Sequence, residues 1–157
     1  MKKKIYIISL ILFIFDLVTK LLVDKYLNLM EQISIIPNFF SLTKVYNYGA
    51  SFNILTNYSN ILIIISIAML IVLYIYQKSF KENIRNIMAF SLLYGGILGN
   101  LINRITYGYV IDFFDFLIFN YNYPVFNFAD IFIVCGIILL VVAIFKKEDL
   151  HGYNSRK

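Results

Sequence analysis

Four long apolar runs, separated by more polar segments, form the main pattern of this 157-residue chain. A run of about 20 apolar residues can cross about 30 Å of hydrocarbon as a helix. The pattern predicts an all-α membrane protein, a single domain over residues 1–157, with transmembrane helices at 5–23, 60–77, 87–104 and 126–145.

Composition supports this class of protein. The chain is 61% hydrophobic and 15% charged, whereas a typical soluble domain carries about 25% charged residues. The first apolar run does not read as a cleaved signal peptide, because Asp16 and Lys20 interrupt it and further runs follow.

The segment between the first two runs has a different pattern. Isoleucine, valine, phenylalanine, threonine and tyrosine alternate there around Pro37 and the turn residues Asn47 and Gly49. Such residues favour short extended strands. We therefore expect a small β-rich cradle outside the membrane between helices one and two.

The basic residues predict the orientation. Ten of the fourteen lysines and arginines precede the first run, follow the last run or lie between the second and third. Basic loop residues are retained on the cytoplasmic side, so both termini are expected to be cytoplasmic. This rule and anionic lipid account for the net charge of +5, and no nucleic-acid partner is expected.

With this topology, polar residues of three runs gather near the outer face. Helical spacing places the members of each set on one side of their helix. The sets are Asp16 with Lys20, Asn100 with Asn103 and Arg104, and Asn127 with Asp130. An ionisable residue inside a span indicates a functional site.

The available side chains restrict the chemistry of this site. The single histidine, His151, is in the C-terminal tail and the single cysteine, Cys135, is in a span, so nucleophilic triads and a histidine zinc site are excluded. Two aspartates sharing a proton could hydrolyse an amide. Asp130 needs a partner, and Asp112 and Asp115 both qualify by spacing.

Five segments in order resemble the blocks of the lipoprotein signal peptidases, also called signal peptidase II. They are DLVTK (16–20), YNYGASF (46–52), GGILGNLINR (95–104), VIDF (110–113) and FNFAD (126–130).

The resemblance implies an aspartic endopeptidase of the bacterial cytoplasmic membrane with Asp112 and Asp130 as its dyad. Its implied partners are membrane lipid and diacylglyceryl-modified prolipoproteins, cut on the amino side of the lipidated cysteine. A monomer without metal or organic cofactor is expected. The residues implied to bind substrate or order the site are Asp16, Lys20, Asn47, Gly96, Asn100, Arg104 and Asn127.

Two positions depart from the family pattern. Asn103 stands where the third block usually has an acid, which removes an expected partner of Arg104. Ile131 follows Asp130 where serine is frequent. Neither departure affects the two aspartates.

Other interpretations remain open. Asp16 and Lys20 could form a structural ion pair, Asn47 could belong to a plain turn, and Gly95 and Gly99 are better explained by helix packing. A proton-coupled carrier or channel subunit is the alternative function, because intramembrane acids also form proton relays. The concentration of polar groups near one face argues against it.

Overall fold

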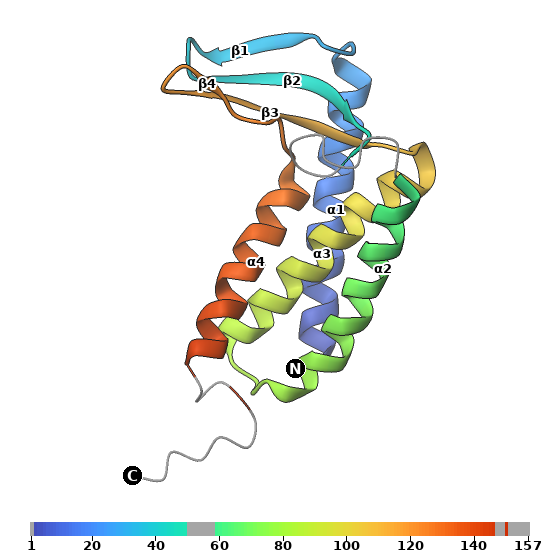
Figure 1. Ribbon diagram of the computed structural model, residues 1–157, viewed down its shortest axis with the longest axis vertical. Helices are drawn as coiled ribbons and strands as arrows, with labels where there is room; N and C mark the ends of the chain where they lie inside the picture. Colours follow the sequence, from blue (N-terminus) through green and yellow to red (C-terminus); the bar gives the residue numbers. More distant parts are fainter. Residues whose placement is uncertain (1, 50–58, 147–149, 151–157) are drawn as a thin grey trace.

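The computed structural model describes residues 2–49, 59–146 and Leu150. Its helices are α1 (Lys2–Tyr26), α2 (Ser59–Tyr76), α3 (Ile84–Tyr107) and α4 (Phe128–Phe145), with a 3₁₀ turn η2 (Gln77–Ser79) after α2. The helices form a bundle with a sheet across one end (Figure 1). Part of the second predicted block, 50–52, and His151 lie outside the described residues.

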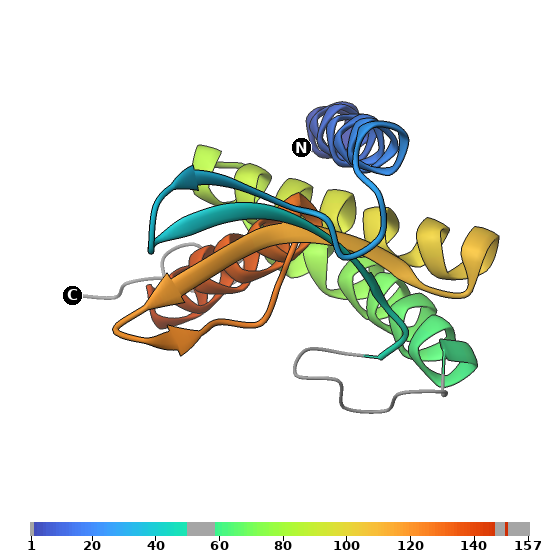
Figure 2. The same ribbon diagram turned by 90° about the horizontal axis from the view of Figure 1, so that it is seen from above.

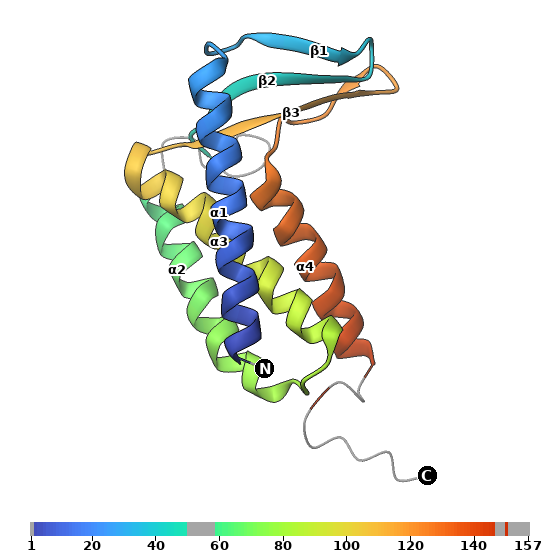
Figure 3. The same cartoon turned by 180° about the vertical axis from the view of Figure 1, so that it is seen from behind.

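Three of these helices are long and apolar enough to cross a membrane, namely α1, α2 continued through η2, and α4. Helix α3 differs because it lies between the others and buries most of its side chains. It crosses the bundle diagonally, with α1 on one side and α2 and α4 on the other (Figures 1 and 3). The protein is therefore a mostly helical membrane protein, and a membrane span for α3 stays a prediction.

The sheet is larger than the predicted cradle. It has the order β1-β2-β3-β4 and is antiparallel, with β1 (Gln32–Ile36) and β2 (Phe40–Asn47) from the connection between α1 and α2. Strands β3 (Val110–Ile118) and β4 (Tyr121–Asn122) come from the connection between α3 and α4, where no strand was predicted. Seen from above, the strands lie over α3 and α4, with α1 and α2 beside them (Figure 2).

The ends of α3 and α4 follow from local capping. The Asn83 side chain accepts a hydrogen bond from Asn86 N at 2.8 Å at the start of α3, which ends at Gly108 with φ 80°. Asn127 and Asp130 form a capping box, so α4 begins after Asn127 and not at 126 as predicted.

Glycines allow α3 to contact its neighbours closely. A Cβ atom at Gly95 would meet Leu12 and Ser9 of α1, and one at Gly99 would meet Asp16. A Cβ atom at Gly96 would meet backbone and side-chain atoms of α4. The expected packing surface of Gly95 and Gly99 is confirmed.

Candidate active site

Asp112 is held under the sheet by two asparagine side chains. It lies on β3 with 1% of its surface exposed, opposite Val45 of β2. Asn127 Nδ2 donates to Asp112 Oδ1 at 2.5 Å, and Asn47 Nδ2 donates to Asp112 Oδ2 at 2.8 Å. Gly49 N donates to Asn47 Oδ1 at 2.9 Å, which fixes the amide orientation.

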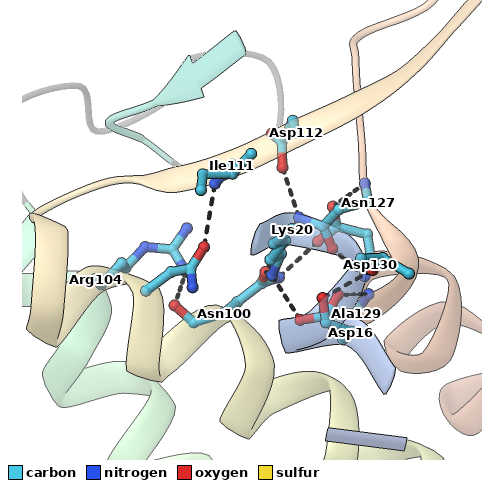
Figure 4. Close-up of polar contacts among 11 residues, drawn as sticks. Asp16, Lys20, Asn100, Arg104, Ile111, Asp112, Asn127, Ala129 and Asp130 are labelled. Atoms are coloured by element: carbon cyan, nitrogen blue, oxygen red, sulfur yellow. Dashed lines mark hydrogen bonds and ion pairs between the residues drawn. The ribbon is translucent and has the colours of Figure 1, made fainter. Parts of the chain in front are cut away.

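Asp130 lies in the first turn of α4 and also accepts a hydrogen bond at each oxygen. Asn100 Nδ2 of α3 donates to Asp130 Oδ1 at 2.8 Å, and the backbone N–H of Asn127 donates to Asp130 Oδ2 at 3.1 Å. Asn127 thus binds Asp112 through its side chain and Asp130 through its backbone (Figure 4). One residue therefore holds both carboxylates.

A buried ion pair between Lys20 and Asp16 of α1 lies next to Asp112 and Asp130. Lys20 Nζ is 2.8 Å from Asp16 Oδ2, and both side chains are fully buried. Lys20 Nζ also donates to Asn100 Oδ1 at 2.8 Å, while Asp16 Oδ1 accepts from Ala129 N at 2.8 Å. The predicted contact within α1 is confirmed, and it connects α1 to both α3 and α4.

Arg104 and Asn103 lie near the C-terminal end of α3. Arg104 donates from Nη2 to Gly49 O at 2.9 Å and from Nη1 to Asn100 O at 3.4 Å. Within the described residues it has no carboxylate at ion-pair distance. Asn103 Oδ1 accepts from Ile111 N at 3.3 Å, so it ties α3 to the strand that carries Asp112.

The structure separates Asp112 from Asp115. An odd separation places them on opposite faces of β3. Asp115 accepts from Thr43 Oγ1 at 2.6 Å and from Gln32 Nε2 at 3.2 Å, within the sheet. It is therefore a half-buried strand residue that contacts side chains of β1 and β2.

Gly96 was also predicted as a site residue, but it lies apart from the hydrogen bonds around the two aspartates. The space beside its Cα is filled by Ala129 O and by Ile133. Its position is explained by close packing of α3 on α4, without contact to the carboxylates. No spacing of small residues in the sequence indicates this role, because the residue four positions after Gly96 is Asn100 and not a small residue.

A cleft of about 900 Å³ runs from the two aspartates between α2 and α4. Its polar end includes Asn47, Asn100, Arg104, Asp112 and Asp130. Farther along, the cleft is lined by Ser66 and Met69 of α2 and by Ile131, Val134 and Cys135 of α4. Ile131 therefore adds an apolar wall beside Asp130.

Burial and then the negative charge of Asp130 raise the pKa of Asp112 to about 7. The hydrogen bonds from Asn47 and Asn127 act in the opposite direction. A carboxyl group of this kind can hold a proton near neutral pH and exchange it. In the described part of the chain, no group of three His, Cys, Asp or Glu side chains could hold a metal ion.

Comparison with known proteins identifies the family of this chain. The family described as Signal peptidase (SPase) II matches residues 8–146. A protein named Lipoprotein signal peptidase from Staphylococcus haemolyticus is 41% identical over 155 residues, covering 95% of this chain and 98% of the relative. One of the same name from Francisella tularensis subsp. novicida is 39% identical over 151 residues, covering 90% of this chain and 91% of the relative.

Two solved bacterial membrane enzymes share the fold. The first, determined by the in meso method at 2.3 Å resolution, has a TM-score of 0.84 and 33% identity, with 98% of this chain and 93% of the other covered. The second, determined by the same method at 1.9 Å resolution, has a TM-score of 0.79 and 36% identity, with 90% and 92% covered. The chain, a membrane protein matched along most of its length, belongs to the signal peptidase II family of aspartic peptidases.

Proposed function

We propose that this peptidase uses Asp112 and Asp130 as its catalytic dyad to remove the signal peptide from diacylglyceryl-modified prolipoproteins. The observation that carries the assignment is the double contact of Asn127, which brings two carboxylates to the end of one cleft. Like charges held this closely favour a state in which the pair shares one proton.

The shared proton gives the pair an acid and a base. The ionised carboxylate removes a proton from a water molecule as the water oxygen attacks the scissile carbonyl carbon, and the protonated carboxyl donates its proton to the carbonyl oxygen. When the tetrahedral intermediate collapses, the C–N bond breaks and the departing amine takes the proton that the first carboxylate received from water. A hydroxyl group of the intermediate gives its proton to the other carboxylate as the new carboxyl group of the product forms. The pair then holds one proton again, as at the start.

The amide groups around the dyad have an orienting role. Asn47 and Asn127 hold Asp112, and Asn100 holds Asp130, each with an N–H group that leaves other carboxylate lone pairs free for water. Arg104 lines the same end of the cleft and is placed to contact the substrate backbone. Asp16 and Lys20 act through Ala129 and Asn100 and do not contact the substrate.

The cleft between α2 and α4 is the proposed entry path for the lipidated segment. Its walls beyond the dyad are mainly apolar and α2 and α4 both pack against α3, so an acyl chain can enter sideways from the bilayer. Cleavage on the amino side of the modified cysteine would then place the diacylglyceryl group in this cleft. The strand residues near Asn47 would form the cradle around the substrate.

The finer membrane arrangement is also part of the proposal. Four helices cross the bacterial cytoplasmic membrane, with α3 as the fourth, both termini in the cytoplasm, the dyad near the outer face and a monomer as the working unit. A cysteine introduced at Phe119, which is fully exposed, should react with an impermeant thiol reagent on intact cells in a Cys135→Ser background. A cysteine at Ile84, exposed at the other end of the bundle, should not react, and the reverse result would contradict this topology.

The test of function is cleavage by the purified protein. We expect it to cut a diacylglyceryl-modified precursor and not the same precursor without lipid. Asp112→Asn and Asp130→Asn should each lower the rate by about 10³-fold or more because each removes an acid–base group. Near-normal cleavage by either variant would disprove the dyad, and flux without cleavage by the intact protein would favour a carrier.

A further inference from the structure

The end of the bundle away from the sheet carries a group of cations. Lysines occupy the first turn of α1, which contains no acid, and further basic residues flank the connection between α2 and α3 (Figures 1 and 3). Glu82 is the acid in this connection, and Lys4 pairs with it at 3.2 Å. Excess positive charge therefore remains on the surrounding lysines.

Two of these lysines lie at the same tyrosine ring. Lys2 Nζ is 5.9 Å from the centroid of the Tyr74 ring, and Lys78 Nζ is 5.4 Å from it. Among the described residues, neither ammonium group has a carboxylate within ion-pair distance. Both ammonium groups are attracted to the same ring, and an anion bound beside it would offset the repulsion between them.

The base of this arrangement is ordered by a buried glutamine. Gln77 is fully buried, and its Nε2 donates to Tyr6 OH at 3.0 Å and to Tyr74 O at 3.3 Å. The Tyr6 ring in turn packs edge-on against Tyr94, with centroids 5.9 Å apart. These contacts fix Tyr74 between the start of α1 and the turn that carries Lys78.

The position of the cluster determines which anions are available. Helix α1 has 25 residues. At 1.5 Å per residue it is about 37 Å long, more than the hydrocarbon thickness of about 30 Å. Its first turn consequently extends into the layer of lipid headgroups, where tyrosine rings are also favoured. Phosphodiester groups are the main anions at this depth.

We infer that Lys2 and Lys78 bind the phosphodiester group of an anionic phospholipid beside Tyr74. A net negative lipid is favoured over a zwitterionic one because the lysines repel the ammonium group of a zwitterionic headgroup. The site is separate from the dyad, which lies at the opposite end of the bundle. It would fix the depth and rotation of α1 and α2 in the bilayer.

The test measures binding of phosphatidylglycerol and phosphatidylcholine to the purified full chain by native mass spectrometry. The intact protein should bind phosphatidylglycerol preferentially. Lys2→Gln and Lys78→Gln should each weaken that binding by about fivefold, and the double variant should weaken it further than either single variant. Tyr74→Leu should weaken it as well, whereas Tyr74→Phe, which keeps the ring, should retain it.

Lys25→Gln is the matched control. Lys25 Nζ lies 5.3 Å from the centroid of Tyr26 at the other end of α1, so this variant removes the same charge from a single lysine–tyrosine contact. It should leave phosphatidylglycerol binding unchanged. Equal loss in Lys25→Gln, or no loss in the double variant, would overturn the site.

Two further measurements keep these outcomes interpretable. Each variant is compared with the intact protein for its unfolding temperature in phosphatidylcholine, and we expect no change because the substituted lysines are exposed. Displacement of phosphatidylglycerol by an equal concentration of inorganic phosphate would show a free-anion site and contradict the lipid assignment. None of these measurements depends on peptide cleavage.

Discussion

Asp16 and Asp112 are both removed from solvent at the same end of the bundle, yet their surroundings treat negative charge in opposite ways. Asp16 has a buried lysine at 2.8 Å, so its charge is neutralised. Among the described residues, Asp112 has only amide donors at hydrogen-bond distance, and the charge of Asp130 raises its pKa. The first arrangement holds α1 against its neighbours, whereas the second keeps a proton available for chemistry.

The ion pair should be the more important of the two for stability. Lys20→Met leaves the Asp16 carboxylate buried without its counterion, and the free energy of unfolding should fall by about 3–5 kcal/mol. Asp112→Asn, in contrast, should cost little stability because it removes a buried charge. Denaturant unfolding in detergent measures both. A loss below about 1 kcal/mol in Lys20→Met would show that Asp16 does not need its partner.

Substitutions of Asn127 test the surroundings of Asp112. Asn127→Ser keeps an oxygen that can cap α4 but removes the side-chain N–H that binds Asp112. We expect the cleavage rate to fall by about tenfold to a hundredfold while the unfolding temperature stays nearly constant. Asn127→Ala removes the cap as well and should also lower stability by about 1 kcal/mol. Full activity in Asn127→Ser would remove the proposed orienting role.

The pH dependence of cleavage reports on Asp112. Because its pKa is raised to about 7, the proton shared by the dyad is lost as the pH rises through this range, and activity should fall there. The hydrogen bond from Asn47 stabilises the ionised form and lowers this pKa, so Asn47→Ala should move the alkaline limb to higher pH. A limb that stays in place or moves down would contradict this charge balance.

Asp115→Asn should have the smallest effect. It weakens contacts with Thr43 and Gln32 on the other face of β3, so we expect a stability change within about 1 kcal/mol and cleavage within twofold of normal. Asp112→Asn makes the same chemical change on the same strand. Comparing the two variants therefore tests whether the position of the aspartate on β3 determines its effect on cleavage. A tenfold loss of cleavage in Asp115→Asn would put the choice between the two aspartates in question.

Local spacing was enough to predict several of these features. Asp16 and Lys20, four residues apart on a helix, share a face, and so do Asn127 and Asp130, although the cap that they form was not predicted. The four helices were located to within a few residues because apolar runs of this length have few alternatives. The assignment of Asp112 over Asp115 came from the family resemblance and not from spacing.

Contacts between distant segments had no local signal. Strand β3 was missed because Asp112 and Asp115 interrupt an otherwise apolar run, and its register against β2 depends on tertiary pairing. The hydrogen bond from Ala129 N to Asp16 joins positions far apart in sequence, and no periodicity within either helix predicts it. Strands β3 and β4 could therefore be identified only from the structure.

Infrared titration of the purified protein tests the central contrast most directly. We predict one protonated carboxyl group that titrates near pH 7, disappears in Asp112→Asn and titrates at lower pH in Asp130→Asn, where the neighbouring charge is gone but burial remains. The signal should remain in Asp115→Asn. A carboxyl signal near pH 7 that survives Asp112→Asn or stays in place in Asp130→Asn, or the absence of any such group near neutral pH, would contradict the account.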